Sequence, residues 1–138
     1  MAQARQRFAA APVARLATVG PDGQPHLVPV TFALDGDHVY TAVDAKPKTT
    51  TNLRRLRNIR RDARVAVLAD HYEAGWDRLW WVRAEGLASI LGDPGDRARP
   101  LELLAARYTQ YRVSPPAGPV IAIVVDRWTG WAASDRPN

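Results

Sequence analysis

The chain of 138 residues contains no cysteine, which excludes disulfides, thiolate catalysis and cysteine-ligated metal sites. It also lacks any apolar run near the roughly 20 residues of a membrane-spanning helix. Its first eleven residues lack the apolar core of a secretory signal peptide. We therefore expect a cytoplasmic protein without a membrane partner. A chain of this length is expected to form one domain over residues 1–138.

The motifs of several enzyme classes are missing as well. There is no glycine-rich phosphate loop, and the three histidines do not stand at metal-ligand spacing, so no metal site is predicted. The serines lack the context of a nucleophile elbow. No pair of carboxylates stands out for acid–base catalysis, so the catalytic residues stay unknown. If the protein is an enzyme, a bound cofactor would supply its chemistry.

Lysine is scarce in a chain rich in basic residues. The two lysines, Lys46 and Lys48, flank Pro47, and the other seventeen of nineteen basic residues are arginine. Thr49 and Thr50 follow, and a helical pattern begins there. Ammonium groups, hydroxyls and free backbone N–H groups at a helix start can bind an anion. This favours a site for the phosphate of a cofactor; the alternative is a solvated basic turn.

The positive charge is concentrated in one part of the chain. The net charge is +5, and residues 46–64 hold eight basic side chains opposed only by Asp62. Such a tract attracts an acidic ligand or a polyanion. Nucleic acid is the less favoured partner, because no tryptophan interleaves with the tract to stack bases.

Hydrophobic periodicity predicts a mainly β protein with small helices. Strands are expected at 13–19, 25–34, 38–43, 64–69, 79–91 and 120–125, and helices at 2–10, 49–61 and 93–112. Turn residues at 21–24 and at Asp35-Gly36 indicate that the first three strands form an antiparallel meander. We expect Phe8 to anchor the first helix and the arginines of the second to face outward. Six strands with a few helices predict an antiparallel barrel.

The five tryptophans fall in three places, and two of them are adjacent. Trp80 and Trp81 should point to opposite faces of the strand at 79–91. Along this strand the even-numbered positions are mostly apolar and the odd-numbered ones include Arg83 and Glu85, so one face should meet the core and the other a polar environment. One can fill the core while the other covers a ring or a partner chain. The alternative for either one is ordinary core packing.

Several motifs, in order and spacing, resemble one protein family. The hairpin Asp22-Gly23-x-Pro25, the run from His26 to Val30, residues 40–43, the lysine pair and the strand at 64–68 resemble the split-barrel flavin-binding proteins that include pyridoxamine 5′-phosphate oxidase. Asp70-His71-Tyr72, the run from Leu79 to Arg83 and Thr129-Gly130-Trp131 resemble an actinobacterial branch described as F420-dependent. The resemblance covers roughly residues 8–133.

The resemblance implies a six-stranded antiparallel split β-barrel that forms a homodimer, with the cofactor bound at the subunit interface. The cofactor would be coenzyme F420 or, alternatively, flavin mononucleotide (FMN), and the substrate a small molecule. The phosphate end would be held by Lys46, Lys48, Thr49 and Thr50. The tricyclic ring would lie beside His26, Val28, Pro29, Val30, Thr31 and Thr41. Trp80 or Trp81, and Trp131, would come near the ring or from the partner subunit.

Three functions follow as alternatives. The first is an F420-dependent oxidoreductase that transfers a hydride from the reduced deazaflavin to an unknown acceptor. The second is an FMN-dependent oxidoreductase, and the third a non-catalytic cofactor carrier or nucleic-acid binder. The arginines from Arg54 to Arg61 would suit the anionic tail of F420. His26 and Thr31 stand where pyridoxamine phosphate oxidases carry arginine and lysine, which disfavours that particular reaction.

Overall fold

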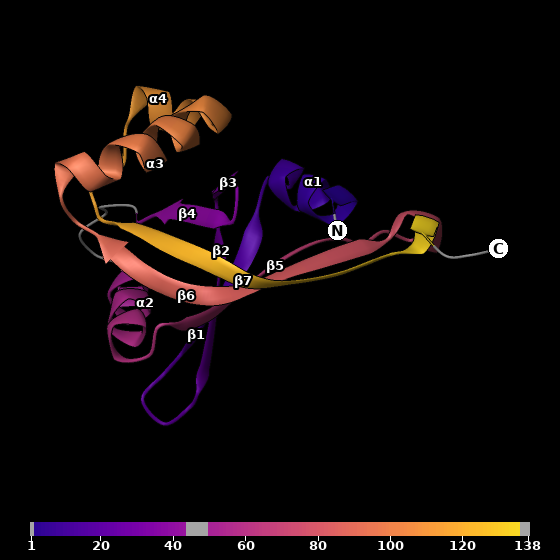
Figure 1. Ribbon diagram of the computed structural model, residues 1–138, viewed down its shortest axis with the longest axis horizontal. Coiled ribbons are helices and arrows are strands. Elements are labelled where there is room, and N and C mark those ends of the chain that lie inside the picture. Colours follow the sequence, from indigo (N-terminus) through magenta and orange to yellow (C-terminus); the bar gives the residue numbers. More distant parts are fainter. Residues whose placement is uncertain (1, 44–49, 136–138) are drawn as a thin grey trace.

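The computed structural model describes residues 2–43 and 50–135 (Figure 1). The described chain forms seven strands and four α-helices, with two short 3-10 helices. The helices are α1 (Ala2–Ala10), α2 (Thr50–Arg61), α3 (Pro94–Arg107) and α4 (Thr109–Val113), with η1 (Trp76–Arg78) and η2 (Ala133–Asp135). The strands are β1 (Ala14–Val19), β2 (Pro25–Val30), β3 (Ala33–Asp35), β4 (His38–Ala42), β5 (Arg64–His71), β6 (Trp80–Leu91) and β7 (Val120–Ala132).

All seven strands belong to one antiparallel sheet in the order β2-β1-β5-β6-β7-β4-β3. Its two outermost strands, β2 and β3, are separated along the chain by Thr31 and Phe32 alone. A link this short spans at most about 11 Å. The sheet must therefore curl until its ends approach each other, which confirms the mainly β, barrel-like architecture.

The predicted opening meander is confirmed as two hairpins, β1-β2 and β3-β4, but not as three continuous strands. Residues 25–34 form two strands rather than one, so the sheet has seven strands instead of six, and β4 pairs with β3 and β7 but not with β2. The chain leaves the sheet after Val30 because the backbone N–H of Phe32 bonds to the Tyr108 hydroxyl instead of to a strand. Pro29 does not interrupt β2, since an edge strand tolerates a missing N–H.

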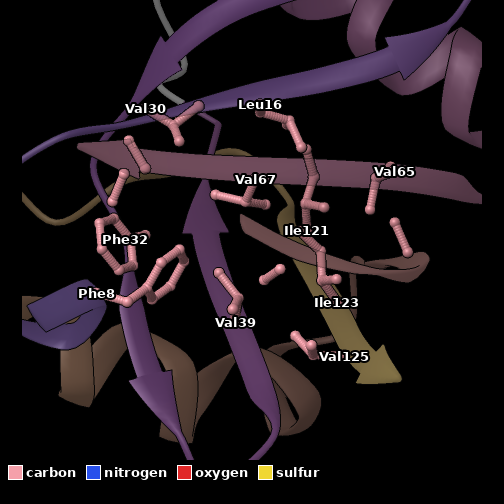
Figure 2. Close-up of a cluster of buried hydrophobic side chains, with 14 of the residues drawn as sticks. Phe8, Leu16, Val30, Phe32, Val39, Val65, Val67, Ile121, Ile123 and Val125 are labelled. Carbon is pink, nitrogen blue, oxygen red and sulfur yellow. The ribbon is translucent and has the colours of Figure 1, made fainter. Parts of the chain in front are cut away.

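The hydrophobic core fills the concave side of the sheet (Figure 2). On β6, Val82, Ala84 and Ala88 are buried, which confirms the predicted alternation. Phe8 of α1 is fully buried, as predicted, and its ring lies 4.9 Å from Phe32, centroid to centroid. Helix α2 covers another part of the core with Leu56 and Ile59.

Two predicted elements differ from the structure. The helix expected at 93–112 is two helices, because Tyr108 adopts an extended backbone (φ −121°, ψ 113°). The strand expected at 120–125 continues to Ala132 as β7, which bends with β6 through a bulge at Glu85/Gly86. None of the helices in the described ranges is long and apolar enough to cross a membrane.

Candidate functional site

The predicted phosphate site lies between β4 and α2 along the chain. Lys46, Lys48 and Thr49 fall outside the described residues, and Thr50 opens α2 with its side chain also undescribed. The described residues on either side of this segment are Val43 and helix α2. Val43 leads into this segment, and its N–H donates to the Pro119 carbonyl at 3.0 Å.

A cationic groove runs along α2, beside the hairpin that joins β1 to β2. Its volume is about 260 Å³. It is lined by Pro21, Gln24, Pro25, His26, Arg54, Arg57, Asn58 and Arg61. Arg54, Arg57 and Arg61 share one helix face because they stand three and four residues apart. No acidic side chain is among these lining residues, so the groove favours an anionic guest.

The acid that directly follows Arg61 is engaged elsewhere. Asp62 lies 2.6 Å from Arg64, oxygen to guanidinium nitrogen. Hydrogen bonds from the Arg64 side chain and backbone lower the pKa of Asp62 to about 2. Asp62 therefore pairs with Arg64, which does not line the groove, and not with an arginine of the groove.

His26 contributes a neutral ring to this groove. Burial and then the charges of Arg54 and Arg55 lower the pKa of His26 below 6.5, so the imidazole is uncharged at neutral pH. Its Nδ1 is buried and has no hydrogen-bond partner within the described parts of the chain. Next to it, Asn58 donates to the Thr18 hydroxyl at 3.0 Å and fixes α2 on β1.

One arginine of α2 departs from the predicted outward face. Arg55 is only 7% exposed, whereas Arg54, Arg57, Arg60 and Arg61 are exposed. Arg55 stands four residues before the buried Ile59 and therefore falls on the stripe that faces the barrel. Burial lowers the pKa of its guanidinium.

The strand residues predicted beside the ring do not share one face. Val28 and Val30 are buried in the core, and Thr41 is 2% exposed. Pro29 points the other way and is exposed. Thr31 is half-buried in the link between β2 and β3, with its hydroxyl 2.6 Å from that of Tyr111.

The tryptophans lie on opposite faces of β6 and β7. Trp80 packs against the core and pairs with the buried Ala132. Trp81 pairs with Trp131 on the outer face. The structure therefore brings Trp81 and Trp131 together, while Trp80 lies on the other side of the sheet.

Beside Trp81 the outer face is hollowed. This outer hollow has a volume of about 390 Å³ and is lined by Leu68, Asp70, Tyr72, Trp81 and Arg83. The Arg83 guanidinium carbon lies 5.4 Å from the centroid of the Trp81 ring. Sequence reasoning missed Arg83 and Asp70 as lining residues, although the odd-numbered positions of β6 indicated a polar outer face.

The family description "pyridoxamine 5′-phosphate oxidase" matches residues 1–132. The chain belongs to this family. A comparison with curated proteins finds no match.

Solved structures share the fold of this pyridoxamine 5′-phosphate oxidase family member. The conserved hypothetical protein Rv2991 from Mycobacterium tuberculosis has a TM-score of 0.78 and 27% identity, over 96% of this chain and 84% of that one. An FAD-binding protein from Mesorhizobium loti has a TM-score of 0.72 and 21% identity, over 94% and 91% of the two chains. An FAD-binding protein from Mycobacterium smegmatis has a TM-score of 0.63 and 16% identity, over 95% and 92%.

Proposed function

We propose that this protein binds a flavin-type cofactor and uses it in an oxidoreductase reaction. Membership of the pyridoxamine 5′-phosphate oxidase family supports this assignment, as do the FAD-binding proteins that share the fold. The observation that carries it is the cationic groove along α2, with no acid among its lining residues, on the helix that follows the two lysines in sequence.

The residues present fit the charged end of such a cofactor. Lys46, Lys48, Thr49 and Thr50 would hold its phosphate at the start of α2, since ammonium groups and helix N–H groups both bind phosphate. The buried, unpartnered Nδ1 of His26 leaves a polar atom in the adjoining groove that a ligand can satisfy. When bound, the cofactor would supply hydride transfer to a small-molecule acceptor, and the protein would orient the reactants.

Within this assignment, coenzyme F420 is the cofactor that we favour. Arg61 stands seven residues beyond Arg54, which is about 10 Å along a helix axis. A row of this length offers contacts to more than one anionic group. The anionic tail of F420 would suit the row better than the single phosphate of FMN.

A fluorescence titration of the purified protein with F420 and with FMN tests this proposal. We expect F420 to bind with micromolar or tighter affinity. Replacing Lys46 and Lys48 by alanine should weaken the binding of both cofactors at least tenfold. Replacing Arg54, Arg57 and Arg61 together by alanine should weaken the binding of F420 at least tenfold and the binding of FMN much less.

Arg60→Ala is the matched control, because Arg60 is an exposed arginine of α2 that does not line the groove. It should leave both affinities within about twofold, as an exposed charge contributes little. Unchanged affinity in the lysine variant would refute the phosphate site. If Arg60→Ala lost as much F420 affinity as the triple arginine variant, the groove would be refuted as the tail site.

An FMN-dependent oxidoreductase is the second candidate, and the FAD-binding proteins that share the fold favour it. A purified protein that is yellow from bound flavin and does not bind F420 would support this second candidate. Nucleic-acid binding would instead be strongly salt-dependent. It remains the least favoured, because no tryptophan, tyrosine or phenylalanine is among the residues that line the groove.

A further inference from the structure

The corner between α3 and α4 holds the short link between β2 and β3. The backbone N–H of Phe32 donates to the Tyr108 hydroxyl at 3.2 Å, and that hydroxyl lies 3.0 Å from the Pro12 carbonyl oxygen. Arg107 donates to the carbonyls of Phe32 and Ala11. The corner therefore fixes the backbone of the link from a point about 76 residues away in sequence.

A third side chain of this region contacts a side chain rather than the backbone. The hydroxyls of Tyr111 and Thr31 lie 2.6 Å apart, and both residues are half-buried. The geometry allows either hydroxyl to donate. A phenol is the stronger donor of the two, and donation by Tyr111 leaves the Thr31 hydrogen free for another acceptor. Tyr111 is itself held edge-on against the Tyr108 ring, 5.7 Å between centroids.

This hydroxyl pair lies at the end of the sheet from which the lysine segment departs. Ala33 pairs with Tyr40, so Thr31 lies toward the Ala42 end of β4. Ala33 and Ala42 pack in one cluster with Leu104, Tyr108 and Tyr111. Val43 and the segment with Lys46 and Lys48 follow Ala42 directly.

We propose that Tyr111 is a positioning residue, which orients the Thr31 hydroxyl to donate a hydrogen bond to the bound cofactor. This inference rests on the proposed function. Arg107 and Tyr108 hold the backbone of the link, whereas Tyr111 sets the direction of the one side-chain donor that the link presents. The class of contact is a neutral hydrogen bond to an oxygen or nitrogen acceptor of a flavin-type molecule.

A double-mutant cycle tests the proposal with FMN and F420 as probes, read by fluorescence. Thr31→Val removes the hydroxyl, and we expect five- to tenfold weaker binding, roughly one hydrogen bond. Tyr111→Phe should weaken binding about two- to fivefold, since the hydroxyl remains but is no longer directed. The double variant should bind no more weakly than Thr31→Val, because the two residues act through one contact.

Thr31→Ser is the conservative variant and should stay within twofold of the unchanged protein. The absorption band of the bound ring gives a second readout. We expect it to shift in Thr31→Val and to return in Thr31→Ser. A purely structural role for Thr31 would not produce this pattern.

Tyr108→Phe is the matched control, because it loosens the same corner without touching the Thr31 hydroxyl. Thermal denaturation shows whether Tyr108→Phe is well folded. If Tyr108→Phe is poorly folded, Arg107→Gln serves as the control instead. Weakening by either control as large as that of Tyr111→Phe would overturn the positioning role, as would unchanged binding in Thr31→Val. Failure of the unchanged protein to bind FMN or F420 would overturn the proposed function itself.

Discussion

Gly86 lies at the bulge where β6 changes register against β7, and there the two backbones come very close. A Cβ atom at this position would lie 2.0 Å from the carbonyl oxygen of Val124 and 2.8 Å from its carbonyl carbon. Backbone atoms of a central strand cannot move aside as a flexible side chain can. Any side chain at this position therefore separates β6 from β7.

Gly86→Ala should lower the free energy of unfolding by about 2–4 kcal/mol, because overpacking here acts on backbone rather than on side chains. Urea denaturation measures the change. Gly92→Ala is the control, since nothing lies within 4 Å of its added methyl group. Equal midpoints for the two variants would contradict the close approach.

His26 should make stability depend on pH. Burial lowers its folded-state pKa below 6.5, so the unfolded chain binds more protons in the interval between the two pKa values. Stability should therefore rise with pH across that interval and fall as the pH drops below about 6.5. The His26 ring resonances followed by NMR give the folded pKa directly.

Arg54→Ala should raise the pKa of His26 and reduce this pH dependence, because Arg54 disfavours the protonated ring. Denaturation at several pH values checks the stability change. A His26 pKa above 6.5 in the unchanged protein would contradict the account.

Helix α1 is attached to the barrel by a buried ring and by an exposed ion pair. Phe8 is fully buried between Phe32 and Trp128. Arg5 also reaches Asp37 at 2.8 Å, but these side chains are 40% and 52% exposed. Solvent screens such a pair, so the phenyl ring should hold the helix.

Phe8→Ala should lower the free energy of unfolding by about 3–5 kcal/mol and make α1 the first site of limited proteolysis. Arg5→Ala should cost less than about 1 kcal/mol. Urea denaturation compares the two variants directly. A larger loss from Arg5→Ala would show that the ion pair attaches the helix.

Local patterns in the sequence predicted individual turns and strands well, but they predicted poorly which elements contact one another. The turn glycines Gly23 and Gly36 adopt positive φ where hairpins were expected, and β6 alternates as predicted. The sequence did not indicate the break between α3 and α4 at Tyr108, whose hydroxyl bonds to Pro12 and Phe32, 96 and 76 residues earlier in the chain. Helical periodicity alone does not contain that contact.

The candidate site was only partly predictable for the same reason. The density of arginine indicated a cationic surface, and the structure has one along α2. The burial of Arg55 depends on how α2 rests on the barrel. The grouping of Trp131 with Trp81 depends on the register between β6 and β7, which no single strand reveals.

At the scale of the molecule, the outer face of the sheet is covered unevenly. Helix α3 contacts β3, β4 and the start of β7, and Ala122 is buried there. Two residues further along, Val124 is 52% exposed beside its register partner Leu87, which is 53% exposed. We propose that a second copy of the chain covers this apolar pair in the expected homodimer.

Leu87→Glu should convert that dimer to a monomer, since it places a charge in an apolar contact. Size-exclusion chromatography with light scattering gives the mass. Val113→Glu is the control, because Val113 is 87% exposed on α4. A monomeric unchanged protein, or a Leu87→Glu variant that stays dimeric, would reject this interface.

The place of β7 in the sheet has a consequence for synthesis of the protein. It lies between β6 and β4 and joins a four-stranded part, β2-β1-β5-β6, to the two-stranded ribbon β4-β3. While the nascent chain is shorter than about 120 residues, only two chain segments join these parts, the short link at Thr31 and Phe32 and residues 43–63, and β4 and β6 both present open edges. Premature termination near the end of the message would therefore yield two unfinished, aggregation-prone sheets rather than a slightly shorter barrel.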